Sequence, residues 1–110
     1  MNEPLPETSV TTRTKPRERT RRLPPFNVIL ENDDHHSFEF VVEVLRKALC
    51  CTEQRAIQLI TEAHETGRAI VWTGSKEVAE LKAEQIQSFH EIRGGGQKLG
   101  PLGVIIEPAL

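Results

Sequence analysis

Tyrosine is absent from this 110-residue sequence, tryptophan and methionine occur once each, and there are only two cysteines. The cysteines are adjacent, at Cys50 and Cys51, and neighbouring residues rarely meet the geometry of a disulfide. We therefore expect no disulfide framework and a reducing, cytoplasmic compartment. No stretch approaches the roughly 18 consecutive apolar residues of a membrane-spanning helix, and no apolar segment follows Met1. We expect neither a membrane span nor a secretory signal.

Charge and proline are concentrated at one end of the chain. Residues 1–25 contain five of the seven prolines and carry a net charge of +3, whereas residues 26–110 carry −5. A proline-rich segment with few apolar residues cannot bury enough surface to offset its conformational entropy. We therefore predict a disordered, basic extension over 1–25 and one folded core domain over 26–110. The basic extension could contact nucleic acid. Nucleic-acid domains, however, usually carry a basic folded face, so no nucleic-acid partner is expected.

Hydrophobic periodicity divides the core into alternating segments. It predicts a strand, two helices, a strand, a helix and a last strand, in that order, at 26–30, 38–49, 53–66, 68–73, 76–93 and 102–106. Each helix follows a capping residue, Ser37, Thr52 or Ser75. Gly67 and the glycine triplet 94–96 are expected to end the second and third helices. The order β-α-α-β-α-β predicts an α+β fold, in which a small three-stranded antiparallel sheet packs against three helices.

The polar residues 32–36, between the first strand and the first helix, are the most informative chemical feature. Their Asn and Asp residues fit ordinary turn chemistry, and His64 on the second helix fits a half-buried histidine bonded to backbone. A metal site is an alternative, but no two histidines have the i, i+4 spacing of zinc-binding helices, so no metal or cofactor is expected. No nucleophile–base pair is visible, so a small hydrolase is not expected. Periodicity alone predicts a small α+β interaction domain.

Several segments resemble one known family, the ClpS adaptors of Clp AAA+ unfoldase–proteases. The matching segments are NVILENDD at 27–34, FEFVVEVL at 38–45, Arg55-Ala56, Ala63-His64 and EVAELK at 77–82. The resemblance runs from about residue 26 to 108, with the same spacing up to the glycine triplet, where a short insertion lies near 94–98. Several segments in one order are far more specific than any single motif.

The resemblance implies a non-enzymatic adaptor that binds polypeptides by a destabilising N-terminal Phe, Leu, Trp or Tyr and delivers them to a ClpA-like unfoldase. A free α-ammonium group has three donors and a positive charge, which suits carbonyl, carboxylate and imidazole acceptors. The family's amine-binding positions correspond to Asn32, Asp33, Asp34 and His64. Its hydrophobic pocket corresponds to His36, Phe38, Val41, Ile60, Ala63 and Leu102. Its docking positions for the N-terminal domain of the unfoldase correspond to Glu77, Glu80 and Lys82.

Parts of the pocket depart from the family pattern. Phe38 stands where a methionine gatekeeper is common, Ile60 and Ala63 replace bulkier or more flexible side chains, and His36 replaces a usual threonine. Phenylalanine adapts its shape less readily than methionine. We therefore expect Phe and Leu N-termini to bind. The sequence leaves open whether N-terminal Ile and Val also bind.

One alternative function stays open. A regulator that docks on the unfoldase without reading N-termini would have no use for Asn32, Asp34 and His64. Glu77 and Glu80 also fit an ordinary solvated helix face.

One modest core with polar faces predicts a monomer.

Overall fold

The computed structural model describes residues 23–110, so residues 1–22 of the predicted extension lie outside the described part. Its elements follow the predicted order: β1 (Phe26–Glu31), α2 (Phe38–Leu49), α3 (Glu53–Thr66), β2 (Arg68–Gly74), α4 (Lys76–Gln87), a short 3₁₀ turn η1 (Gly94–Gly96) and β3 (Val104–Pro108). The predicted α+β class is confirmed. The Ala109 N–H donates to the Pro25 carbonyl at 2.8 Å, so ordered pairing begins before the predicted boundary at residue 26.

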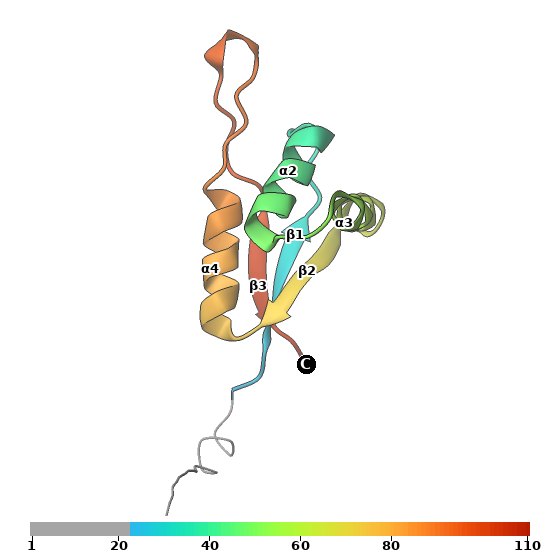
Figure 1. Ribbon diagram of the computed structural model, residues 1–110, viewed down its shortest axis with the longest axis vertical. Helices are drawn as coiled ribbons and strands as arrows, with labels where there is room; N and C mark the ends of the chain where they lie inside the picture. The colour runs from blue at the N-terminus through green and yellow to red at the C-terminus, as the bar shows by residue number, and fades with distance from the viewer. Residues whose placement is uncertain (1–22) are drawn as a thin grey trace, which may run out of the picture.

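The sheet has the strand order β2-β1-β3, and both pairings are antiparallel as predicted. Figure 1 shows α2 between α4 and α3, and α2 packs against both of these helices. Val28 and Leu30 of the central strand are fully buried in the core, together with Leu45 of α2, Leu59 of α3 and Ile86 of α4. One core therefore joins the sheet to all three helices, and it fixes the end of β1 against α2 and α3.

The three predicted caps begin their helices. The hydroxyl oxygens of Ser37, Thr52 and Ser75 accept backbone N–H bonds from the following turn at 3.2, 3.1 and 3.4 Å. Gly67 ends α3 with a φ of 96°, a left-handed conformation that glycine adopts without steric cost. These ends determine where α2 and α3 stand beside the loop that follows β1.

The prediction that the third helix continues to about residue 93 is wrong, because α4 ends at Gln87. Residues 90–100 instead fold back on themselves as a hairpin, here called the arm, which projects beyond the helices in Figure 1. Ile92 pairs with Lys98, and Arg93 and Leu99 make further cross-strand backbone hydrogen bonds. The arm thus satisfies its backbone without a helix, and Gly95 and Gly96, with φ of 82° and 80°, form its turn.

The last strand is displaced from its predicted position. It spans Val104–Pro108 rather than 102–106, and Leu102 lies in the preceding segment with 1% of its surface exposed. β3 is an edge strand, where a proline such as Pro108 is tolerated because its missing N–H removes no interior ladder bond. Pro108 therefore does not end the strand as early as the sequence suggested.

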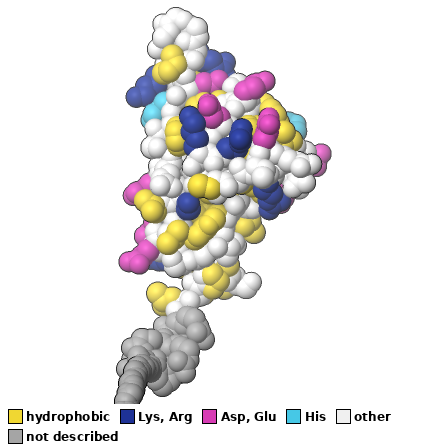
Figure 2. Space-filling view, in the orientation of Figure 1, with side chains coloured by type: hydrophobic (Ala, Val, Ile, Leu, Met, Phe, Trp, Pro, Cys, Tyr) yellow, Lys and Arg dark blue, Asp and Glu magenta, His cyan; other side chains and the backbone are white. Residues whose placement is uncertain are grey.

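The surface of the described residues mixes charges of both signs. On the face seen in Figure 2, basic and acidic side chains are interspersed over α2 rather than separated. Both cysteines are free, and Cys50 is exposed at the C-terminal end of α2. No helix within residues 23–110 is long and apolar enough to cross a bilayer.

Candidate functional site

A cavity of about 310 Å³ opens between the end of β1, the start of α2 and the second half of α3. It is lined by Asn32, Asp33, His36, Phe38, Val41, Ile60, Thr61 and His64. A smaller hollow of about 30 Å³ shares part of this wall and adds the buried side chains of Ala63 and Leu102. The structure thus brings together all the predicted amine-binding and pocket residues except Asp34, which is exposed and lines neither space.

Thr61 lines the cavity although the sequence analysis did not select it. It stands three residues before His64 on α3, a spacing that places both side chains on the same side of a helix. Apolar periodicity does not select a polar residue such as Thr61. Its i, i+3 spacing from His64 is the feature of the sequence that indicates it.

The backbone of Asn32 is fixed at the mouth of the cavity. Its N–H donates to the Gly67 carbonyl at 3.0 Å, and the preceding N–H of Glu31 donates to the Gly103 carbonyl at 2.9 Å. Because Gly67 ends the helix that carries His64, the first bond sets Asn32 beside that helix. The exposed Asn32 side chain, a carbonyl acceptor and an amide donor, therefore lines the same cavity as the His64 ring.

His64 is exposed at the cavity, and its ring makes no hydrogen bond to any residue of the described part. The reading of His64 as a half-buried histidine bonded to backbone is therefore wrong. In its neutral form one ring nitrogen is an acceptor available to a ligand. Within residues 23–110, no three His, Cys, Asp or Glu side chains gather in a way that could hold a metal ion.

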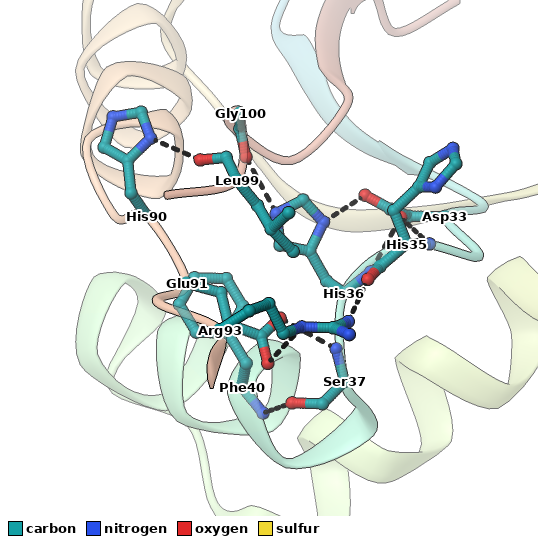
Figure 3. Close-up of polar contacts among 10 residues, drawn as sticks. All are labelled: Asp33, His35, His36, Ser37, Phe40, His90, Glu91, Arg93, Leu99 and Gly100. Atoms are coloured by element: carbon teal, nitrogen blue, oxygen red, sulfur yellow. Dashed lines mark hydrogen bonds and ion pairs between the residues drawn. The ribbon is translucent and has the colours of Figure 1, made fainter. Parts of the chain in front are cut away.

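Asp33 organises the loop between β1 and α2 (Figure 3). Its Oδ1 accepts the backbone N–H groups of His35 and His36 at 2.6 and 3.1 Å, and its Oδ2 lies 2.6 Å from Nδ1 of His36. Partial burial raises the pKa of this carboxyl, but the hydrogen bonds from His35 and His36 outweigh it and leave the pKa below its ordinary value. Both carboxylate oxygens are therefore already engaged within the loop.

The lowered pKa of Asp33 predicts how the free energy of unfolding depends on pH. A carboxyl whose pKa is lower in the folded than in the unfolded chain stabilises the fold above its unfolded pKa, near 3.8, and loses that contribution as pH falls through the folded pKa. We expect Asp33→Asn to lower the free energy of unfolding at pH 7, and the difference from the parent chain to shrink below about pH 4. Denaturant unfolding of both chains at pH 7, 5 and 3 measures it. A difference that is the same at all three values would contradict the assignment.

Phe38 forms part of the cavity wall and also faces a second, neighbouring groove. Its side chain is 46% exposed at the first residue of α2. The second groove, of about 530 Å³, is lined by Phe38 together with Glu39, Val42, Glu43, Arg46 and Glu53. The Phe38 ring therefore borders both spaces, which places it where it can limit the size of a side chain in the cavity.

The predicted docking residues lie on α4, away from the cavity. Glu77, in the first turn, and Glu80 are exposed. Lys82 is partly buried, and its Nζ donates to the Ala48 carbonyl at 3.0 Å. Since Ala48 lies in the last turn of α2, Lys82 satisfies a carbonyl that has no partner within the helix. Lys82 thus has a role within the fold that the sequence did not reveal.

Residues 21–102 match the family described as ATP-dependent Clp protease adaptor protein ClpS. The chain is 39% identical over 83 residues to the ClpS adapter of Roseobacter denitrificans, covering 76% of this chain and 72% of that one. It is 40% identical over 76 residues to the ClpS adapter of a Ruegeria species, covering 69% and 67%. The solved structure of Agrobacterium tumefaciens ClpS2 bound to L-phenylalaninamide is similar over 80% of this chain and 100% of that one, with a TM-score of 0.69 and 30% identity.

Proposed function

The chain belongs to the ClpS family of Clp protease adaptors, and from this premise we propose that its cavity binds the N-terminal residue of polypeptides for delivery to a Clp unfoldase–protease. One observation carries the proposal: a single cavity joins apolar walls from Val41 and Ile60 to the polar groups of Asn32 and His64. A relative of the same fold was solved with L-phenylalaninamide, a free amine next to an aromatic side chain. The chain acts as an adaptor and not as a catalyst.

The polar residues suit a free α-ammonium group. The Asn32 carbonyl and a neutral His64 nitrogen accept two of its three donors. The carboxylate of Asp34, which is exposed and does not line the cavity, accepts the third through a water. Asp33 adds negative charge while its oxygens hold the loop. An internal peptide N–H has one donor and no charge, and it would leave acceptors unpaired at a cost of about 1–3 kcal/mol.

The apolar part of the cavity suits one large side chain. At about 310 Å³ it lies near the lower end of small-ligand sites, which is room for one residue rather than a longer segment. Burying an aromatic or leucine side chain there contributes roughly 1.5–3 kcal/mol. His36 and Phe38 contribute to its wall, and Ala63 and Leu102 line the smaller hollow that shares part of this wall.

Peptides that differ only in their first residue test this proposal. We expect Phe and Leu to bind and Ala to bind at least about tenfold more weakly, because its methyl group leaves the apolar wall uncovered. Fluorescence anisotropy with labelled peptides at pH 7.5 gives the affinities. Ile and Val report on Phe38, since equal binding of these β-branched residues would mean that this ring does not restrict the cavity. Affinity that does not depend on residue one would overturn the function.

The acidic face of α4 is the proposed contact with the N-terminal domain of a ClpA-like unfoldase. Glu77 and Glu80 are exposed there, and Lys82 both caps α2 and borders this face. Replacing Lys82 would alter the end of α2, so charge reversal at Glu77 is the cleaner test. We expect Glu77→Lys to weaken binding to the isolated unfoldase domain at least about tenfold, because it reverses the charge at the proposed contact. Glu65→Lys, on the exposed side of α3, is the matched control. Equal binding of both variants would remove α4 from the interface.

Two further properties complete the proposed role. The chain acts in the cytoplasm, in keeping with its two free cysteines. It acts as a monomer that presents the cavity to one partner and α4 to another. Sedimentation of the full chain at micromolar concentration checks the second property, and a stable dimer would contradict it.

A further inference from the structure

The arm contacts the loop that carries the proposed amine-binding residues. Glu91 Oε1 accepts the Ser37 N–H at 2.9 Å, and the Arg93 guanidinium donates to the His35 carbonyl (Figure 3). The Arg93 Nε also lies 3.5 Å from Glu91 Oε2, so the two side chains brace each other. The bond from Ser37 lowers the pKa of the Glu91 carboxyl, as expected for a carboxylate held by a donor.

The arm is built to present these two side chains to the loop. Neighbouring residues of an extended strand point to opposite sides, so Glu91 and Arg93 share one side and Ile92 takes the other. Ile92 is accordingly 61% exposed. The turn at Gly95 and Gly96 allows the return strand to pair with the first, which holds Glu91 and Arg93 at a fixed separation.

His36 provides a second link between the arm and the loop. Its side chain is only 4% exposed, and it stacks on Phe40 with ring centres 5.2 Å apart. Its Nδ1 lies 2.6 Å from Asp33 Oδ2, and its Nε2 lies 2.8 Å from the Gly100 carbonyl at the base of the arm. The ring thus joins the arm directly to Asp33, the residue next to Asn32.

We propose that the arm braces the amine-binding loop, with His36, Glu91 and Arg93 as positioning residues that hold Asn32 and Asp33 in place for the substrate amine. The proposal rests on the proposed function of the cavity. The three links converge on consecutive residues, 35 to 37, and residue 36 in turn contacts Asp33. A loop fixed in this way loses little conformational freedom when a ligand binds, which favours affinity.

Two pairs of variants test the brace in the full chain. Glu91→Ala removes the acceptor for the Ser37 N–H, whereas Glu91→Gln keeps an oxygen at that position. Replacing residues 93–97 by Asn-Gly shortens the arm to a two-residue turn and removes Arg93, since Ile92 and Lys98 are already paired. Lys98→Ala, whose side chain has no polar contact with the loop in the described residues, is the matched control for the shortened arm.

The first readout is affinity for a peptide beginning with Phe. We expect Glu91→Ala and the shortened arm to weaken binding about three- to tenfold, with Glu91→Gln and Lys98→Ala within twofold of the parent chain. The second readout is hydrogen exchange of the His35 and His36 amides without peptide. These amides bond to Asp33 and not to the arm, so faster exchange in Glu91→Ala reports loosening of the loop itself.

The two readouts separate this inference from the function on which it rests. Unchanged affinity and unchanged exchange at His35 and His36 in both disruptive variants would overturn the brace. A purely structural arm would lower the free energy of unfolding while leaving both readouts as in the parent chain, which also overturns it. If the parent chain does not bind the Phe peptide, the cavity's function fails, and the exchange rates alone decide whether the arm holds the loop.

Discussion

Replacing His64 by alanine is expected to weaken binding of a peptide with a free N-terminal Phe by about 10- to 100-fold. The reason is the loss of an acceptor for a charged donor, and hydrogen bonds to charged groups contribute about 1.5–3 kcal/mol. His64 lines the cavity and is exposed, so its truncation removes a ligand contact and leaves the core packing intact.

His35→Ala is the control for this experiment. His35 is an exposed histidine of the same loop, and its side chain makes no hydrogen bond within the described residues. Isothermal titration calorimetry of the parent chain and both variants at pH 7.5 gives the affinities. We expect His35→Ala to bind like the parent. Equal affinities for His64→Ala and the parent would remove His64 from the amine site.

The largest effect on stability is expected for Leu45→Ala. Leu45 is fully buried at the centre of the core, one turn after Val41 of the cavity wall. Truncating a buried leucine removes its transfer free energy and leaves a cavity, with a typical cost of about 2–5 kcal/mol. Small domains are stable by only about 5–15 kcal/mol, so a large part of the free energy of unfolding would be lost.

Leu81→Ala provides the matched comparison. Leu81 lies on α4 with half of its surface exposed, and changes at such positions usually alter stability by less than about 0.5 kcal/mol. Guanidinium unfolding followed by circular dichroism measures both variants. Similar losses for Leu45→Ala and Leu81→Ala would mean that the core is not packed around Leu45 as described.

Much of the fold could be predicted because local signals agreed with one another. Apolar spacing, a capping hydroxyl and a terminal glycine all marked α3, and its observed ends match the prediction. Ser37 likewise marked the first residue of α2. The strands β1 and β2 were recognised because short β-branched runs lie between turn residues, and their observed ends differ from the predicted ones by one residue.

The arm could not be predicted because its structure depends on contacts far apart in the sequence. Residues 88–93 continue a helix-compatible composition, so local propensity alone favours a longer helix. The chain leaves the helix after Gln87 because Glu91 and Arg93 find partners in the loop at 35–37, more than 50 residues away. Such pairing overrides local propensity and leaves no periodic signal in the sequence.

The site, like the fold, could be predicted from the sequence only in part. Residue types and the family resemblance indicated most of the residues that the cavity brings together. The role of each residue within the fold could not be predicted. Asp33 holds the loop through His35 and His36. Lys82, on α4, donates a hydrogen bond to a carbonyl at the C-terminal end of α2. These roles depend on which donors and acceptors meet in three dimensions, and composition says little about that.

The proposed function requires the cavity to recognise a free amine together with a large side chain. The most direct test compares two peptides of identical sequence beginning with Phe, one with a free N-terminus and one N-acetylated, by calorimetric titration at pH 7.5. Acetylation keeps the aromatic ring but removes the charge and two of the three donors. We expect the free peptide to bind and acetylation to weaken binding at least about 100-fold, because several charge-assisted hydrogen bonds disappear together. Equal binding of the two peptides would contradict it.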